Sequence, residues 1–467
     1  MFITKQYYRF TLYYEMRKYM VLFFIVLTTS NATIHAQNNL DIIEYHEAIK
    51  IISSQKYNLP DTPVIAILDK GVNLEHEDLK ANIWINKAEI TENGNDDDEN
   101  GFVDDVNGWN FANNTNDISI GGIGNWHGTP VNGIIGAEYD NYVGVKGISP
   151  AVKLMNLVKG ESIESVINAL QYVYQMRKTY NETNGQSGAY IVAVNCSWGK
   201  DSLWASDYPH WCAMYDSLGS VGVLSTHSVP NNNINIDAFG DMPATCKSNY
   251  LITVTNSNRY DEKVYDAGYG SYSVDLAAPG DNTYTALNTG GYGYFGGTSA
   301  AAPYVSGLIG LLHLAPSDNF QQYARHYPSE SATLIKTVIM NGVDHRAGLA
   351  NITVSGGRVN TFKSMKLLCD HFGEQHLYEN LFEPIQILSV VPNPASAHTS
   401  VQIECNKNFD ISINIADING RNVFTQESYI QEGVSTVPIN LAGLNAGFYI
   451  IHITSERIIK STKLVIQ

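Results

Sequence analysis

Val64-Ile65-Ala66-Ile67-Leu68-Asp69 is a run of five apolar residues that ends at an acid. A strand that is apolar on both faces is typical of the centre of a parallel sheet, which is covered on both sides. Further strand-like runs occupy 152–158, 190–194 and 221–225, and a helix-compatible stretch occupies 162–178. This alternation predicts an α/β domain with a mainly parallel sheet. Functional residues are expected at the carboxyl ends of such strands, where Asp69 lies.

Two other segments place reactive residues among small ones. His127 opens the segment His-Gly-Thr-Pro-Val-Asn-Gly, and Ser299 lies within Gly-Thr-Ser-Ala-Ala-Ala-Pro. A serine hydroxyl is a weak nucleophile and needs a base within hydrogen-bond reach, which in turn needs an orienting group. We therefore expect Ser299 to be a nucleophile, His127 its general base, and Asp69 the carboxylate that orients the imidazole.

These three segments, in this order, resemble the active-site segments of the subtilisin-like serine proteases, the subtilases. The resemblance covers residues 60–372. It implies a subtilisin-like fold, with a mainly parallel sheet flanked by helices, and a secreted serine endopeptidase that forms an acyl-enzyme. It also implies that a segment following the strand near 190 binds extended polypeptide substrates through its backbone. The substrate-binding residues expected there are Ser197, Trp198 and Gly199.

The family usually carries an asparagine after a buried strand, as a donor to the oxyanion of the reaction. Here the run 222–225 is that strand, and Asn231 and Asn232 follow it. We expect the Asn231 amide to hold the oxyanion together with the backbone N–H of Ser299, with Asn232 as the alternative. Losing such a donor typically costs about 10²–10³ in rate.

Three positions depart from the family pattern without removing a catalytic group. Lys70 stands where the family usually has Thr or Ser, Pro130 where it has His or Ser, and Tyr304 where it has His. These departures leave a rival interpretation open, a catalytically dead subtilase fold that acts as a surface binding module. A third hypothesis is an esterase that uses the same triad, and such an enzyme would not need the peptide-binding segment.

An acidic loop lies between the first two motifs. Residues 96–105 alternate oxygen-bearing side chains with other residues and include a glycine, which resembles the start of a calcium loop. Position twelve of the loop is Asn107 rather than an acid, so a complete helix–loop–helix site is not expected. The alternative is a solvated acidic loop without a metal. The predicted calcium ligands are Asp96, Asp98, Asn100, Asp104 and Asp105, with the carbonyl of Phe102.

Composition and the N-terminus indicate export. The net charge of −17 argues against nucleic-acid binding, which needs a basic face. Arg17 and Lys18 precede an apolar run, 20–27, and a small-residue cleavage site ends at Ala36. The alternative is a membrane anchor, although a span needs about 20 apolar residues. We expect a monomer.

The chain has five cysteines. In an exported protein disulfides are permitted, and an odd count leaves at least one thiol unpaired within the chain. Spacing cannot decide the connectivity, but the pair Cys212–Cys246 is favoured.

From residue 387 onward short alternating strands and turn signals predict a small antiparallel sandwich. This region resembles the C-terminal sorting domain that the type IX secretion system of certain Gram-negative bacteria recognises. The alternative is a generic sandwich that shields the protease or binds carbohydrate. The residues that carry the resemblance are Val391-Pro392-Asn393-Pro394-Ala395, Ile418-Asn419-Gly420-Arg421, Leu444-Asn445-Ala446-Gly447-Phe448-Tyr449 and Lys463-Leu464-Val465-Ile466-Gln467.

The sequence thus predicts five parts: a signal peptide (1–36), a short helical lead-in (37–60), a peptidase domain (61–372), a linker (373–386) and a sorting domain (387–467). The expected partners are polypeptide substrates and the type IX secretion machinery. The expected location is outside the cell or on its surface, reached through the periplasm.

Overall fold

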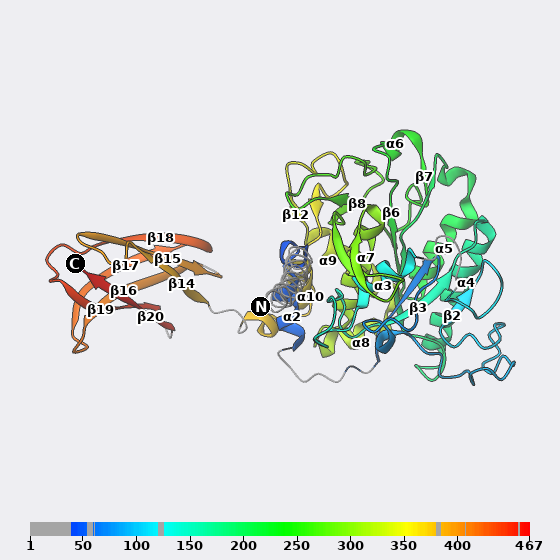
Figure 1. Cartoon of the computed structure of the whole chain (residues 1–467), viewed down its shortest axis with the longest axis horizontal. Helices are drawn as coiled ribbons and strands as arrows, with labels where there is room; N and C mark the ends of the chain where they lie inside the picture. Colours follow the sequence, from blue (N-terminus) through cyan, green and yellow to red (C-terminus); the bar gives the residue numbers. More distant parts are fainter. Residues whose placement is uncertain are drawn as a thin grey trace, which may run out of the picture. The chain divides into compact units, whose positions relative to one another are not determined.

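The protein folds into two compact units, which meet in sequence at Glu374 and Gln375 (Figure 1). The computed structural model describes residues 39–53, 59, 61–119, 126–379, 384–406, 408–455 and 458–467. The predicted signal peptide lies outside the described residues.

The first unit is built on a nine-stranded sheet whose strands pair in parallel, except for an antiparallel β12 at one edge. From that edge, the strands are β12 (Asp344–His345), β13 (Gly357–Arg358), β9 (Leu276–Pro279), β8 (Leu251–Ser257), β6 (Leu224–Ser228), β4 (Ile191–Cys196), β1 (Val64–Asp69), β3 (Lys153–Val158) and β2 (Gly108–Asn110). The predicted mainly parallel sheet is confirmed.

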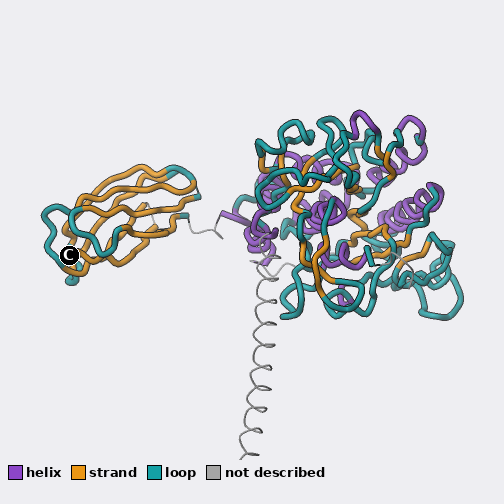
Figure 2. The backbone as a smooth tube through the Cα atoms, turned by 45° about the horizontal axis from the view of Figure 1, so that its top comes forward, coloured by secondary structure: helices purple, strands orange, loops and turns teal. Residues whose placement is uncertain are grey.

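Helices lie on both faces of the sheet (Figures 1 and 2), and alternate residues of β1 pack toward different helices. Ala66 and Leu68 belong to the core cluster that includes α4 (Ile163–Glu182) and α5 (Pro209–Ser220). Ile65 points the other way, because a Cβ on Gly310 of α7 (Thr298–His313) would lie 2.8 Å from its Cδ1 atom. Helix α3 (Gly128–Gly136) packs against α7. Burial on both faces explains why the central strands are apolar throughout.

The remaining elements of this unit are short or peripheral. They are α2 (Tyr45–Ser53), η1 (Lys80–Asn82), β5 (Lys200–Asp201), η2 (Ala205–Asp207), α6 (Ile236–Phe239), β7 (Asp241–Met242), β10 (Thr283–Ala286), β11 (Tyr292–Phe295), α8 (Asp318–His326), α9 (Pro328–Asn341), α10 (Thr361–His371) and, in the second unit's sequence range, α11 (His376–Glu379).

Most expected elements lie within a few residues of their predicted bounds. One strand starts late: the run predicted at 221–225 becomes strand only at Leu224, because Val221 caps the end of α5 and Gly222 turns the chain with a φ of 95°. Helix α4 begins where predicted, since the Ser162 side chain accepts a hydrogen bond from the N–H of Ser165.

No single helix among the described residues is long and apolar enough to cross a membrane. Helices α7 and α8 meet that criterion only as a pair, and the pair is bent by 107°.

The second unit is an antiparallel sandwich, as predicted. One sheet has the order β14-β15-β18 and the other β17-β16-β19-β20. Strand β14 starts within the predicted linker 373–386, which also contains α11. The strands are β14 (Ile385–Val391), β15 (His398–Cys405), β16 (Phe409–Asp417), β17 (Asn422–Ile430), β18 (Gly433–Asn440), β19 (Gly447–Ser455) and β20 (Ile458–Ile466).

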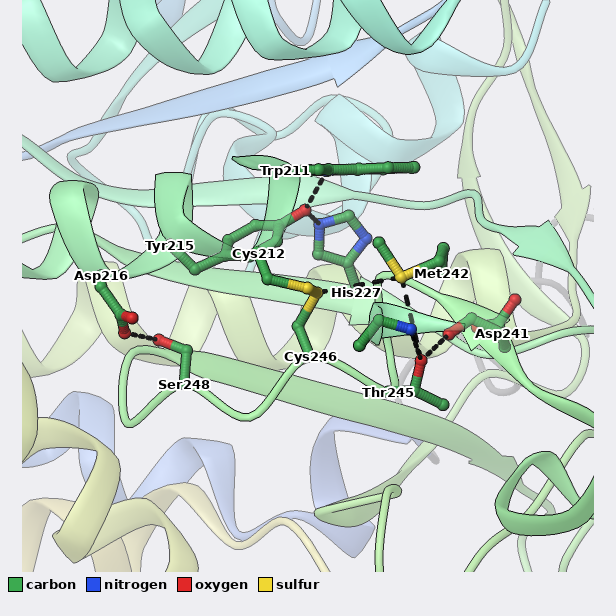
Figure 3. Close-up of a disulfide and its surroundings, with 11 residues drawn as sticks. Trp211, Cys212, Tyr215, Asp216, His227, Asp241, Met242, Thr245, Cys246 and Ser248 are labelled. Carbon is green, nitrogen blue, oxygen red and sulfur yellow. Dashed lines mark hydrogen bonds between the residues drawn. A yellow bond between two sulfur atoms is a disulfide. The ribbon is translucent and has the colours of Figure 1, made fainter. Parts of the chain in front are cut away.

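A disulfide joins Cys212 of α5 to Cys246, which follows β7 (Figure 3). The favoured pairing is therefore confirmed. The bond lies beside a buried polar group in which Trp211 donates to the hydroxyl of Tyr215, and that hydroxyl contacts Nε2 of His227. The other three cysteines, Cys196, Cys369 and Cys405, are buried and lie outside this disulfide.

Replacing Cys212 and Cys246 together by Ser should lower the free energy of unfolding by about 3–4 kcal/mol, because the bond closes a loop between residues 34 apart in sequence. Thermal unfolding of the native and doubly substituted chains measures this difference. Reductant should lower the melting temperature of the native chain but not that of the variant, and equal melting temperatures without reductant would contradict the prediction.

Candidate active site

Asp69 and His127 form a hydrogen-bonded pair at the carboxyl edge of the sheet. Asp69 ends β1 and is buried, and His127 immediately precedes α3. The Nδ1 atom of His127 lies 2.8 Å from Oδ1 and 3.0 Å from Oδ2 of Asp69. A carboxylate accepts here, so Nδ1 carries the proton and Nε2 is left as the acceptor. The imidazole is thereby set up to take a proton from a neighbouring group.

Glycine at position 128 makes this pairing possible. A Cβ there would lie 2.0 Å from the carbonyl oxygen of Gly71 and 3.5 Å from the Cβ of Asp69. Any other residue would push the start of α3 away from the loop that follows β1. The small residue beside the histidine is therefore a steric requirement for bringing His127 to Asp69.

Ser299 lies in the first turn of α7, half-buried. Its hydroxyl donates to the carbonyl oxygen of Ser197 at 3.0 Å, and the hydroxyl of Ser197 donates to the carbonyl of Ser299 at 2.8 Å. Among the described residues no hydrogen bond joins Ser299 to His127. Catalytic hydrogen bonds are often long in the absence of substrate and shorten when substrate binds.

Asn231 is anchored beside the same helix start. Its Oδ1 accepts from the backbone N–H of Thr298 at 2.9 Å and from the Thr298 hydroxyl at 3.2 Å. The Nδ2 group is left as the donor of this side chain. Gly297 has a φ of 87°, and a Cβ there would lie 2.9 Å from Oδ1 of Asn231. Asn232, the alternative, instead donates to Oδ2 of Asp201 at 2.9 Å.

The predicted substrate-binding segment follows β4 directly. Ser197 is buried, Trp198 partly buried and Gly199 exposed. The indole Nε1 of Trp198 donates to the carbonyl of Leu68 at 2.6 Å, which ties this segment to the end of β1. The ammonium of Lys159 lies 5.0 Å from the centre of the indole ring, and burial lowers the pKa of that ammonium. The segment is therefore held firmly on its inner side.

The acidic loop brings together only part of the predicted ligand set. The carboxylates of Asp96 and Asp98 lie with that of Glu89 in one group, whose ligand atoms are all within 4.8 Å of one another. Both carboxylate oxygens of Asp104 accept backbone N–H groups, from Asn93 and Gly94.

The other two predicted ligands are bonded to protein groups. Asp105 accepts from the hydroxyl of Tyr172, and the side chain of Asn100 both donates to Asp105 and accepts from the N–H of Phe102. Burial raises the pKa of Asp105, against those hydrogen bonds.

The sequence does not predict Glu89 as a calcium ligand, because it lies seven residues before the acidic run and no regular spacing connects it to the loop. It is 8% exposed, and burial raises the pKa of its carboxyl group. Its Oε1 accepts from the N–H groups of Asp97 and Asp98, whereas Oε2 is buried and has no hydrogen-bond partner among the residues that the structure describes. An unpartnered buried carboxylate oxygen beside two other carboxylates fits an oxygen-ligating cation such as Ca²⁺.

Comparison with known proteins matches both units. Residues 61–356 match the model of the subtilase family, and residues 389–467 match that of a secretion system C-terminal sorting domain. A subtilisin-like protease 1 from Plasmodium berghei (strain Anka) is 27% identical over 353 residues, which cover 71% of this chain and 53% of the relative. This chain thus spans about half the length of that relative.

Thermitase from Thermoactinomyces vulgaris is 28% identical over 312 residues, covering 65% of this chain and 88% of thermitase. The A-subunit of the AB5 toxin from E. coli has a similar fold, with a TM-score of 0.50 at 18% identity, over 71% of this chain and 99% of that structure.

Proposed function

The chain belongs to the subtilase family of serine proteases, and from this premise we propose that it is a secreted endopeptidase whose catalytic residues are Asp69, His127 and Ser299. One observation carries the proposal: the hydrogen-bonded pair Asp69–His127 lies at the carboxyl edge of the sheet, and no described residue forms a hydrogen bond with the acceptor nitrogen of the imidazole. The buried carboxylate stabilises the imidazolium that forms when Ser299 loses its proton.

In the proposed reaction His127 Nε2 removes the proton from Ser299 as Oγ attacks the peptide carbonyl carbon. The tetrahedral intermediate carries its negative charge on the former carbonyl oxygen. The Nδ2 group of Asn231 and the backbone N–H of Ser299 hold that oxygen, since the N–H groups in the first turn of a helix have no intrahelical acceptor. His127 then gives its proton to the leaving amine, which departs as the C–N bond breaks.

The acyl ester on Ser299 is hydrolysed by the reverse sequence. Water gives a proton to His127 while its oxygen attacks the ester carbon, and Ser299 recovers the proton as the acid product leaves. The backbone that follows β4, from Ser197 to the exposed Gly199, pairs with an extended substrate by adding a strand, which favours a polypeptide substrate over a simple ester.

The rival function is a binding module with this fold and no catalysis. The observation that favours it is that no hydrogen bond joins Ser299 to His127 among the described residues. The two functions differ in whether the hydroxyl of Ser299 reacts. An organophosphonate probe that labels only an activated serine separates them.

Ser299→Ala should abolish phosphonate labelling and lower kcat by several orders of magnitude. The melting temperature should change little, because the half-buried hydroxyl is not part of the hydrophobic core. Cleavage of a peptide library and probe labelling are the measurements. Ser217→Ala is the matched control, since that exposed hydroxyl bonds only to its own helix. Labelling of native protein that persists in Ser299→Ala would refute the assignment of the nucleophile.

We also propose that Glu89, Asp96 and Asp98 bind a structural calcium ion. The support is their convergence and the unpartnered Oε2 of Glu89. Three carboxylates this close repel one another, and a divalent cation removes that repulsion. The ion has no step in the reaction and acts by holding the loop to the domain.

Calcium at 100 times its dissociation constant should stabilise the fold by about 2.7 kcal/mol, because only the folded loop assembles the ligands. Differential scanning calorimetry with calcium and with a chelator measures this. Glu89→Gln combined with Asp98→Asn should remove the calcium-dependent rise in melting temperature, whereas Asp117→Asn, an exposed acid outside the cluster, should retain it. An unchanged calcium response in the double variant would place the ion elsewhere.

The C-terminal unit contains a sorting domain, and we propose that it directs the protein through the periplasm and the type IX secretion system to the cell surface or medium. Its hydrophobic core is formed by its own residues, including Ile403, Ile413, Ile451 and Leu464. A unit with its own core is expected to fold independently of the peptidase unit.

Deleting residues 385–467 should leave kcat/KM on peptide substrates nearly unchanged, because the catalytic groups all belong to the other unit. In a host with type IX secretion, the shortened protein should accumulate in the periplasm, as measured by immunoblots of cell fractions. Normal extracellular amounts of the shortened protein would overturn the sorting role.

A further inference from the structure

Asp241, the first residue of β7, is an acid that the proposed reaction does not use. Its side chain is fully shielded from solvent, and both carboxylate oxygens are buried without a hydrogen-bond partner in the described part of the chain. Its carbonyl oxygen, in contrast, accepts from the N–H and the hydroxyl of Thr245 (Figure 3). Among the described residues no lysine, arginine or histidine forms an ion pair with it. Burying a carboxyl group without partners is costly, so a residue of this kind calls for an explanation.

The carboxylate of Asp241 lies against the proposed substrate-binding segment. A Cβ on Gly199 would be 3.1 Å from its Oδ1 and 3.4 Å from its Oδ2. Gly199 is exposed and lies two residues after Ser197, whose carbonyl oxygen contacts the hydroxyl of Ser299. Two residues of extended chain span about 7 Å. The buried acid is therefore within reach of a long side chain attached next to the bond that Ser299 would attack.

A second contact ties this acid to the proposed oxyanion loop. Strands β5 and β7 are antiparallel and Asp201 is the direct partner of Asp241, so the two side chains lie on one face. Asp201 in turn accepts a hydrogen bond from Asn232, the neighbour of Asn231. Asp241 thus lies beside the backbone that would hold the substrate, and its partner Asp201 links the strand pair to the loop that carries Asn231.

The charges around Asp241 favour a cationic ligand. Burial, and then the negative charge of Asp201, raises the pKa of Asp241 to about 8. Lys200, which precedes Asp201 in β5, does not supply this cation, because its Nζ donates to the carbonyl oxygen of Glu161. A positive group arriving at Asp241 would gain a charge-assisted hydrogen bond and return the carboxyl group to its ionised form.

We propose that Asp241 determines specificity, by pairing with an arginine or lysine side chain at the residue on the acyl side of the scissile bond. This inference rests on the proposed peptidase function and names the substrate class of that site. Arginine should be preferred over lysine, because its planar guanidinium can donate to both unpartnered oxygens at once and stays charged at all relevant pH values. Asp201, at the exposed rim, adds negative charge that attracts such substrates.

The test compares kcat/KM on matched peptides with arginine, lysine, leucine or phenylalanine on the acyl side. The native enzyme should cleave the arginine peptide fastest. Asp241→Asn should lower kcat/KM for the arginine peptide about 100-fold or more, while cleavage of the leucine peptide changes little. Asp216→Asn, which removes one exposed acid on α5, should leave all four values unchanged.

The pH dependence gives a second readout. The ratio of kcat/KM for the arginine peptide to that for the leucine peptide should increase as the pH rises through about 8, where Asp241 ionises. The contribution of His127 cancels in this ratio. The other described titratable groups that interact with Asp241 are Asp201 from β5 and Tyr215 from α5, and the pKa of Tyr215 is raised well above 10 by burial, so it stays neutral. Asp241→Asn should make the ratio independent of pH.

Three results would overturn the inference. The first is a native enzyme that prefers leucine or phenylalanine, which decides the matter even when Asp241→Asn does not fold. The second is an Asp241→Asn variant that cleaves all peptides equally less well, which indicates a structural role. The third is a pH-independent ratio in the native enzyme.

A separate measurement distinguishes failure of the inference from failure of the proposed function. Native protein that neither cleaves peptides nor reacts with the phosphonate would refute catalysis alone. In that case, isothermal titration of Ser299→Ala with the arginine and leucine peptides decides the inference: tighter binding of the arginine peptide, lost on adding Asp241→Asn, supports it, and equal binding of the two peptides overturns it.

Discussion

The shared carboxyl edge of three adjacent parallel strands is the constraint on which the rest of the site depends. Strands β1, β4 and β6 are parallel neighbours in the sheet, so the residues that follow them emerge side by side. The first strand supplies Asp69, the second leads to the segment at Ser197, and the third leads to Asn231. Two helices packed against each other, α3 and α7, start at the same edge and bring His127 and Ser299. The contacts between these groups follow from strand order rather than from distance along the chain.

Close backbone approach is the second condition. Side chains on the catalytic segments are small because each segment touches another segment's backbone. At Gly128 a single added carbon would overlap the carbonyl of Gly71, and at Gly297 it would press on the side chain of Asn231. The glycines beside the reactive groups therefore matter because they have no side chain. The missing Cβ allows the segments that carry these groups to approach one another closely.

The acids of the peptidase unit differ in how their burial is compensated. The carboxylate of Asp69 accepts hydrogen bonds from Nδ1 of His127 and from the backbone N–H of Lys70, the latter at 2.7 Å. These two bonds compensate for its burial. Glu89 has one oxygen satisfied and one not, and Asp241 has neither. Because an unpartnered buried carboxylate is unfavourable, these last two positions are where we propose that groups from outside the chain bind, a metal ion in one case and a substrate side chain in the other.

The sequence by itself determined the fold class, the two-unit organisation and the local context of Asp69, His127 and Ser299, because strand periodicity and small-residue motifs are properties of short stretches. Neither Glu89 nor Asp241 could be found in this way. Glu89 reaches the acidic loop from outside it, and Asp241 reaches Gly199 through pairing between two-residue strands that carry no periodic signal. Only the tertiary structure decided these contacts, since they depend on which distant backbones lie together and on which oxygens remain without a partner.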